Sequence, residues 1–397
     1  MSEKYSEEWV MSRRNPNHGL EPLKRVLHRL GDPQEKLQII HVTGTNGKGS
    51  VCNDLKEILR AEGYRTGLFT SPHLMTHRDR IRINDEIIGA DVFHSYLMQF
   101  ADQIEIENLG MFEIDCVIAF LWFRDQKVDY AIMEAGLGGR LDNTNVISHS
   151  VLSVVTSVAY DHMQILGHRL MQIGFEKAGI MKPYGRLVSS RLKREVESVF
   201  RYQAARRHCA YSVCPAWYDH GLRTFMFEGE EYHLSSYAQY QKKNAALALY
   251  CAEMLGINIH TERVHKALMK AQWPGRFEVV NEKPLVILDG AHNEEGMKAL
   301  LESMKILPRP VRIVYSALKD KPARSMAEAY CSFADQMFVT HFDNSRADDL
   351  KDLAVPGSLV RTDWKEALKE ACSGEEGSVV VTGSLYFVSL VREFLKK

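Results

Sequence analysis

The segment from His41 to Ser50 constrains the fold of this 397-residue chain more than any other segment. It reads His-Val-Thr-Gly-Thr-Asn-Gly-Lys-Gly-Ser, follows an apolar run at 37–42 that predicts a strand, and precedes a helical pattern from Val51. A strand, a glycine-rich turn and a helix together form a cradle for phosphates, because glycine admits close backbone approach and a helix N-terminus attracts anions. We therefore expect an α/β domain that binds a nucleoside triphosphate.

Individual residues of this loop have predicted tasks. Lys48 supplies a mobile cation, and the hydroxyl of Ser50 can reach a magnesium ion on the outer phosphates. The remaining predicted phosphate contacts come from Asn46, Gly47 and Gly49. The general pattern G-x-x-x-x-G-K-[ST] is not matched, because Ser50 comes one residue late. A glycine-rich turn with an incidental lysine is the alternative, and the strand and helix on either side argue against it.

Length and composition indicate a multidomain globular protein. A chain of 397 residues suits two or three domains. The 50 basic and 51 acidic residues give a net charge of −1, so bulk charge gives no reason to expect nucleic-acid binding. No apolar run approaches the ~18 residues that a membrane span needs, and the polar N-terminus lacks the apolar core of a signal peptide. We expect no membrane association and a cytoplasmic location, in which the seven scattered cysteines stay reduced.

Strand-like and helical patterns alternate along the chain, which is typical of a mostly parallel α/β sheet. Strands are expected at 37–42, 130–134, 151–155, 186–189, 285–288, 311–315, 337–340 and 379–382. Helices are expected at 20–30, 51–61, 112–123, 241–255, 261–272, 296–304 and 365–371. A Pro-Gly pair and the turn-prone segment 281–284 separate two α/β series. We therefore predict a large ATP-binding domain at 1–280 and a smaller, Rossmann-like α/β domain at 281–397.

A second group of polar residues follows two of these strands. Glu134 begins a glycine-rich segment at 134–145, at the end of a predicted strand where ligands of open α/β sheets collect. Asp161 and His162 follow the next strand, and Lys177 comes shortly after. From the residues alone, Glu134 suits a magnesium ligand as well as a helix-capping acid. His162 is an unusual ligand for magnesium, and Lys177 is by default a solvated lysine on a helix.

The ordered set of motifs resembles the folylpolyglutamate synthases, including the bifunctional dihydrofolate synthase/folylpolyglutamate synthases, within the Mur ligase superfamily. The resemblance extends over nearly the whole chain. It rests on Gly19-Leu20-Glu21, 30–34, the loop at 43–50, Thr70-Ser71-Pro72-His73-Leu74, 80–83, Phe112-Glu113, 134–145, Asp161-His162, 176–180, 273–278, 288–293 and Thr382-Gly383-Ser384-Leu385.

The resemblance implies roles for ATP and metal ligands. Asn244 would contact adenine, and Arg276 and Asp289 would contact ATP from the hinge and the second domain. Magnesium ligands would be Ser50, Ser71, Glu134, His162 and Lys177. Lys177 matches a lysine that reacts with carbon dioxide to form a carbamate, which turns a cation into a carboxylate-like anion. The expected catalytic set is Lys48, Glu134, His162 and Lys177. The expected cofactors are ATP as a substrate, two Mg²⁺ ions and a monovalent cation such as K⁺.

The resemblance also implies a substrate side. Phe112, Glu113, Leu141, Asp142 and Asn143 fall in segments that contact the pterin in the bifunctional enzymes. His292 and Ser384 match positions associated with the incoming glutamate. The chain departs from the family pattern at Asp79, at Gly110-Met111, at Asn143 and at His168-Arg169, and these departures leave the ATP set unchanged.

The expected reaction is the ATP-dependent addition of L-glutamate to the glutamate carboxylate of a folate through an acyl phosphate. Conversion of dihydropteroate to dihydrofolate is an open second activity. A Mur-type ligase acting on another carboxylate is the first alternative; only about 36 residues precede the first strand, too few for the nucleotide-sugar domain of such enzymes. A P-loop switch or motor and a non-catalytic binding protein are further alternatives. We expect small-molecule substrates and a monomer.

Overall fold

The computed structural model describes residues 4–14 and 19–396, so the first three residues of the polar N-terminal segment lie outside it. The chain divides into two compact units. The first comprises residues up to His220, Thr224–His233 and Lys243–Ala271; the second comprises Gly221–Arg223, Leu234–Lys242 and the chain from Gln272. The predicted division after residue 280 falls inside a strand, β12, and stays a proposal.

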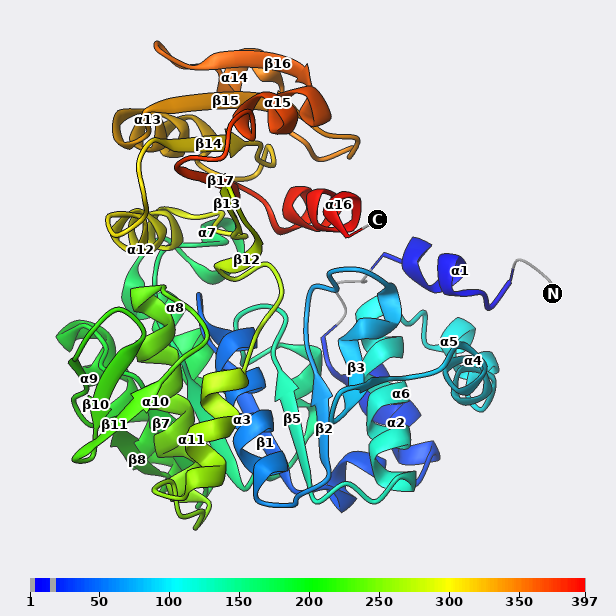
Figure 1. The fold of residues 1–397 in the computed structure, drawn as a ribbon. Helices are drawn as coiled ribbons and strands as arrows, with labels where there is room; N and C mark the ends of the chain where they lie inside the picture. The colour runs from blue at the N-terminus through cyan, green and yellow to red at the C-terminus, as the bar shows by residue number, and fades with distance from the viewer. Residues whose placement is uncertain (1–3, 15–18, 397) are drawn as a thin grey trace. The chain divides into compact units, whose positions relative to one another are not determined.

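The first unit is built on an eight-stranded sheet with the order β4-β3-β2-β5-β1-β6-β7-β8 (Figure 1). The six strands from β2 to β8 in this order are parallel, and β3 and β4 extend one edge as antiparallel strands. The strands are β1 (Ile39–Thr43), β2 (Thr66–Phe69), β3 (Ile81–Ile83), β4 (Glu86–Ile87), β5 (Tyr130–Glu134), β6 (Leu152–Val155), β7 (Arg186–Ser189) and β8 (Ala210–Val213). The central strands β1, β5 and β6 are apolar and buried, as strands covered on both faces must be.

The helices before residue 272 belong to the first unit, except that residues 239–242, the start of one helix, belong to the second. They are α1 (Glu7–Ser12), α2 (Glu21–Arg29), α3 (Lys48–Ala61), α4 (Ala90–Met98), α5 (Ala101–Ile106), α6 (Met111–Asp125), α7 (Met163–Leu166), α8 (Leu170–Ala178), α9 (Arg194–Arg207), α10 (Gln239–Met254) and α11 (Glu262–Lys270), with short 3₁₀ turns η1 (Pro33–Lys36), η2 (His77–Arg80) and η3 (Asn143–Val146). Helix α6 is almost entirely buried in one apolar cluster, and α8 and α9 pack together in another. A small antiparallel sheet is formed by β9 (Tyr218–Asp219), β10 (Thr224–Phe227) and β11 (Glu230–His233).

The second unit contains a six-stranded sheet with the order β12-β13-β17-β14-β15-β16, parallel except for β12. Its strands are β12 (Glu278–Glu282), β13 (Leu285–Leu288), β14 (Val311–Tyr315), β15 (Gln336–His341), β16 (Leu359–Asp363) and β17 (Ser378–Thr382). Its helices are α12 (Glu294–Met304), α13 (Ala323–Phe333), α14 (Leu350–Leu353), α15 (Trp364–Ala371) and α16 (Leu385–Leu395). Two apolar clusters, one on each face of this sheet, form the core of the unit.

The structure confirms the predicted mostly parallel α/β class and every predicted strand and helix, with ends shifted by a few residues. The pattern missed edge strands such as β3, β4 and β16, whose sequences are short or polar. It also missed α8 and α9. In α9 this is because the sequence is basic and only four of its residues are buried, so its apolar periodicity is weak. Among the described residues, the helices include none long and apolar enough to cross a membrane.

Candidate active site

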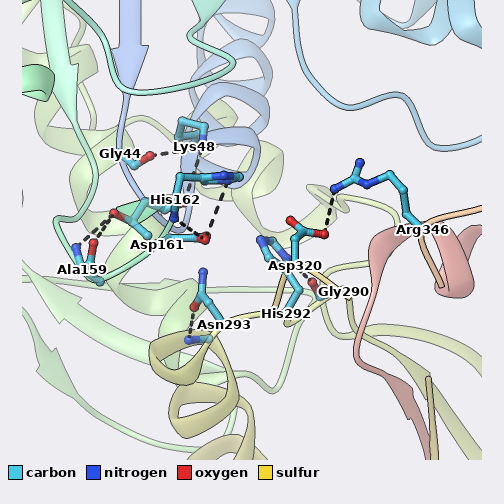
Figure 2. Close-up of polar contacts among 12 residues, drawn as sticks. Gly44, Lys48, Ala159, Asp161, His162, Gly290, His292, Asn293, Asp320 and Arg346 are labelled. Carbon is cyan, nitrogen blue, oxygen red and sulfur yellow. Dashed lines mark hydrogen bonds and ion pairs between the residues drawn. The ribbon is translucent and has the colours of Figure 1, made fainter. Parts of the chain in front are cut away.

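The glycine-rich loop runs from the end of β1 to the start of α3, as predicted. Gly47 precedes the helix with φ 87°, a left-handed conformation that glycine adopts without strain. Lys48 is the first helical residue, and its ammonium donates to the carbonyl oxygens of Gly44 at 3.1 Å and Thr45 at 3.4 Å (Figure 2). The lysine therefore folds over the loop that would hold the phosphates.

A second segment, Thr156 to Ala159, supports this loop from the end of β6, and the sequence pattern did not reveal it. The hydroxyl of Ser157 accepts the N–H of Asn46 at 2.8 Å, and the Thr156 hydroxyl donates to the Asn46 carbonyl at 2.6 Å. Thr45 exchanges bonds with Ala159 at 3.0 and 3.3 Å. A Cβ atom on Gly44 would collide with Thr156, so only glycine permits this approach. The loop is thus held in shape by its neighbour.

Asn244 on α10 lies against Gly47 of the loop. A Cβ atom on Gly47 would come within 2.5 Å of the Asn244 side-chain oxygen. Asn244 is itself buried. The structure therefore brings Asn244, 200 residues away in the sequence, to the loop that the resemblance assigns to ATP.

Glu134 ends β5, next to β1, and is 3% exposed. The N–H of Ser71, which follows β2 on the other side of β5, donates to the Glu134 carboxylate at 3.3 Å. Ser50, in the first turn of α3, is 2% exposed. Two of the proposed metal ligands, Ser71 and Glu134, are thus in direct contact.

Lys177 lies on α8 and is 2% exposed, so the structure rules out the solvated surface lysine that its sequence context suggested by default. Burial lowers its pKa from 10.5 to about 7, and the positive charge of Lys48 adds to this shift; Asp161 and Asp142 oppose it. A buried lysine whose amine is neutral near physiological pH is chemically unusual and suits a functional site.

Asp161 and His162 form one turn before α7. The carboxylate of Asp161 accepts the N–H of His162 at 2.9 Å and lies 3.8 Å from its Nε2 atom (Figure 2). His162 has φ 48°, and its side chain is 40% exposed, while that of Asp161 is 10% exposed. Asp161, which was not among the predicted site residues, therefore both orients the histidine and faces Lys177 electrostatically.

Asp142 has a clear role inside the glycine-rich segment. Its carboxylate accepts the N–H of Leu137 at 2.7 Å and the N–H of Thr144 at 3.0 Å, and it is 6% exposed. Burial raises its pKa. Asp142 thus caps η3 and shapes the loop whose neighbouring residues Leu141, exposed, and Asn143, half-buried, were assigned to the substrate side.

Phe112 and Glu113 lie at the start of α6. The ring of Phe112 packs on Phe69 with centroids 5.4 Å apart and lies 2.9 Å from where a Cβ on Gly136 would be. The Glu113 carboxylate accepts the N–H of Gly110 at 2.8 Å and is 1% exposed. Phe112 therefore contacts the glycine-rich segment, while Glu113 caps its own helix.

In the second unit, Asp289 follows β13 and is 3% exposed. Its carboxylate accepts the N–H groups of Phe277 and Ala291, both at 2.9 Å, and the phenol of Tyr240. Burial raises the pKa of Asp289, while these hydrogen bonds and the nearby Arg276 oppose the shift. Tyr240, which the sequence did not single out, is thus a principal partner of this carboxylate.

His292 and Ser384 follow two neighbouring strands of the second sheet, β13 and β17. The Nδ1 atom of His292 lies 2.9 Å from the Gly290 carbonyl (Figure 2), and Ser384 is the N-cap of α16. The C-terminal ends of parallel strands meet at one edge of a sheet, where ligands bind. The second unit therefore places Asp289, His292 and Ser384 at one edge.

Each unit thus collects its own share of the predicted residues. Within the first unit, the glycine-rich loop, Asn244, the Glu134–Ser71 pair and Lys177 gather around the C-terminal ends of β1, β5 and β6. Among the described residues, no group of three or more His, Cys, Asp or Glu side chains forms a ready metal cluster.

Comparison with known protein families assigns both units. Residues 42–252 match the Mur ligase middle domain, and residues 275–385 match the Mur ligase glutamate ligase domain. The fold and the glycine-rich loop are therefore those of a Mur ligase.

Relatives narrow this assignment. The dihydrofolate synthase/folylpolyglutamate synthase of Bacillus subtilis (strain 168) is 38% identical over 410 residues, covering 95% of each chain. The chain belongs to the folylpolyglutamate synthase/dihydrofolate synthase family of Mur ligases. The folylpolyglutamate synthase of Thermotoga maritima superposes with a TM-score of 0.85 at 33% identity, covering 98% of this chain and 96% of that one. The folylpolyglutamate synthase of Mycobacterium tuberculosis, solved with ADP and AMPPCP, superposes with a TM-score of 0.87 at 26% identity. The match covers 98% of this chain and 97% of that one.

Proposed function

We propose that this chain is an ATP-dependent ligase that joins L-glutamate to the glutamate carboxylate of a folate. Family membership supports the reaction, and one observation supports the chemistry most directly. Lys177 is enclosed beside the charges of Lys48 and Asp161, next to a phosphate-binding loop that Ser157 holds in shape.

The reaction must overcome two obstacles. A carboxylate is a poor acyl donor, and phosphoryl transfer from ATP converts it to an acyl phosphate whose phosphate leaves readily. The amine of glutamate then attacks this acyl carbon, and the amide forms as phosphate departs. Both early partners are anions, so Lys48 and the backbone N–H groups at the start of α3 lower the barrier by opposing the charge on the transferred group.

The donor set of the first unit fits magnesium. Hydroxyls of Ser50 and Ser71, the buried carboxylate of Glu134 and the half-exposed His162 would hold it; oxygen donors with one carboxylate suit this hard cation. When bound, magnesium supplies positive charge to the phosphate oxygens. The proposal includes two Mg²⁺ ions and a monovalent cation such as K⁺.

Lys177 completes this set in carbamylated form. Only a neutral amine attacks carbon dioxide, and the lowered pKa of about 7 leaves a large neutral fraction at physiological pH. The resulting carbamate is an anion with two oxygens in a place where an ammonium is destabilised. This change of sign explains why a lysine stands in a metal site.

The second unit would serve ATP and glutamate. Arg276 and Asp289 are assigned to ATP, and His292 and Ser384 to the incoming amino acid, at the strand ends described above. On the folate side, Phe112 contacts the glycine-rich segment that carries Leu141 and Asn143. We propose that these residues receive the pterin, with Glu113 and Asp142 keeping their backbones in place through the bonds already described.

The bifunctional name of the Bacillus subtilis relative makes dihydropteroate a second candidate substrate. We propose further that the enzyme works as a cytoplasmic monomer on small molecules alone.

Substrate-dependent ADP release tests the proposal. Purified protein with MgATP and glutamate should release ADP on addition of tetrahydrofolate, and not on addition of UDP-linked peptide precursors. The same assay with dihydropteroate decides the second activity. ADP release only with a UDP-linked precursor would overturn the assignment to folate.

A further inference from the structure

Helices α7, α8 and α9 line an open hollow that the proposed reaction does not use. It has a volume of about 780 Å³ and lies wholly within the first unit. One face of α8 (Met171, Phe175) and one face of α9 (Tyr202, Gln203, Arg206) form its walls. Figure 1 shows α8 and α9 neighbouring each other at the edge of the large sheet.

The walls are apolar and aromatic, yet they face solvent. Ile165 is 69% exposed, Met171 47%, Phe175 42% and Tyr202 61%. Exposed large apolar side chains that gather around one hollow usually mark a binding site. Two of them are aromatic rings, which favour a flat ring as their guest.

The polar groups that line the hollow indicate which class of ligand it can bind. Gln203 is 6% exposed, and its amide makes no hydrogen bond to the described part of the chain, although it lines the hollow. The amide of Gln203 is not among the fully buried polar groups that lack a partner, so it is accessible to a ligand in the hollow. An amide offers both a donor and an acceptor, so it complements the edge of a nitrogen heterocycle.

The charge of the hollow is positive. Glu176 is neutralised by Arg140, at 3.0 Å, whereas Arg206 has no ion pair with any described residue and lies over the Tyr202 ring at 5.8 Å. An arginine beside an aromatic wall suits a carboxylate or phosphate attached to a flat ring.

We propose that this hollow is a second binding site, for a planar nitrogen-heteroaromatic anion. The ring lies between Phe175 and Tyr202, its edge bonds to the Gln203 amide, and its anionic group pairs with Arg206. Folates and adenine nucleotides share this chemistry. The site does not depend on the reaction proposed above.

The site is also placed to influence the proposed active site. Glu176 directly precedes Lys177 in the sequence, and α7 directly follows His162. Leu166 lies 2.8 Å from where a Cβ on Gly138 would be, so the floor of the hollow touches the glycine-rich segment. A guest that orders α7 and α8 would act on His162 and Lys177 through the backbone.

Hydrogen–deuterium exchange on the full chain tests the proposal, with folic acid and AMP as separate probes. The double variant Tyr202→Ser/Arg206→Gln changes two exposed residues and should keep the fold. Arg201→Gln is the matched control, because Arg201 lies on the same helix but pairs with Glu197 away from the hollow.

At least one probe should slow exchange in residues 163–206. The double variant should need at least ten times more probe for the same protection, and Arg201→Gln should need the same concentration as the wild type. Protection by folic acid alone or by AMP alone identifies the source of the guest. Unchanged protection in the double variant would mean that the signal comes from the proposed active site, and absence of protection with both probes would equally overturn the second site. If the wild-type chain released no ADP with folate and glutamate but still showed this protection, only the proposed reaction would be refuted, and the second site would stand.

Discussion

Lys177 is enclosed in the first unit close enough to Lys48 for the two positive charges to oppose each other, and burial adds a larger penalty of the same sign. One of these lysines, Lys48, caps the phosphate loop, and the other has a pKa of about 7. Two positive charges this close destabilise the folded protein and attract anions.

Lys48→Ala should abolish ADP release and amide formation without unfolding the protein. The lysine is half-buried, and within the described residues its ammonium bonds only to loop carbonyls, so its loss removes charge from the phosphate site and little packing. We expect a fall in kcat/KM of about a hundredfold to a thousandfold, the size typical of removing an electrostatic donor. Thermal unfolding should show a near-native Tm, and a variant that retains most of its turnover would contradict the role.

Ser157→Ala should weaken ATP binding through the shape of the loop. The change removes the 2.8 Å and 3.0 Å bonds between the Ser157 hydroxyl and the backbone of Asn46. Each such bond is worth about 1 kcal/mol, so the folded protein should lose about 1–2 kcal/mol of stability. KM for ATP should rise, by up to about tenfold, because binding must then order a looser loop. Ser95→Ala, which removes an exposed bond from a serine to its own helix, is the control and should leave KM unchanged. If Ser157 had a purely structural role, Ser157→Ala would lower Tm and leave KM for ATP unchanged.

The sequence predicted the glycine-rich loop between a strand and a helix, because that pattern lies in consecutive residues. Buried parallel strands such as β1 and β5 were also predictable, since apolar runs identify them. The supporting bonds from Thr156 and Ser157 were not predictable. They arise from the pairing of β6 with β1, and spatial proximity of that kind leaves no local pattern.

The burial of Lys177 shows the same limit. A lysine on a helix is normally exposed, and the pattern of α8 gave no reason to place it inward. Tyr240 likewise reaches Asp289 across almost 50 positions. Partners that meet only through the tertiary fold could be assigned only by resemblance or by the structure itself.

Tyr240→Phe should destabilise the second unit in a pH-dependent way. The phenol donates to the Asp289 carboxylate, and burial already raises the pKa of this acid above 3.8. The folded state then holds a proton that the unfolded state has released, so stability falls as pH rises through that window. Removing the donor raises the folded pKa further and enlarges this fall.

The measured deficit of Tyr240→Phe should therefore be greater at pH 8 than at pH 5, with a size of about 1–3 kcal/mol at pH 8 from chemical unfolding. Tyr315→Phe is the control, because its phenol donates at 2.9 Å to the neutral carbonyl of Ala323. Its deficit should not depend on pH. Equal pH profiles for the two variants would disprove the charge-assisted bond.

Lys177→Met should stabilise the metal-free protein while it removes activity. A folded pKa lowered from 10.5 to about 7 means that the unfolded state binds more protons between these values, so stability rises with pH across this window. Below pH 7 the full penalty applies, on the order of 5 kcal/mol for this shift at about 1.4 kcal/mol per pKa unit. The gain in Tm from Lys177→Met should thus be greater at pH 6.5 than at pH 9.5, measured with a chelator present. A loss of stability at pH 6.5 would contradict the buried-cation account.

Lys177→Ala tests the carbamate directly. If the modified lysine supplies an anion beside Glu134 and His162, its removal should nearly eliminate turnover, and formate or acetate should restore part of it by filling the vacated space. The wild-type enzyme should lose activity when carbon dioxide is stripped from the buffer, and more completely at pH 6.5 than at pH 8, because the amine is neutral above its pKa of about 7. Lys182→Ala is the control: this second largely buried lysine bonds to Asn145 and Ile147, so small carboxylates should not rescue it. An active Lys177→Ala enzyme together with an unmodified Lys177 in a magnesium-loaded crystal would exclude the carbamate.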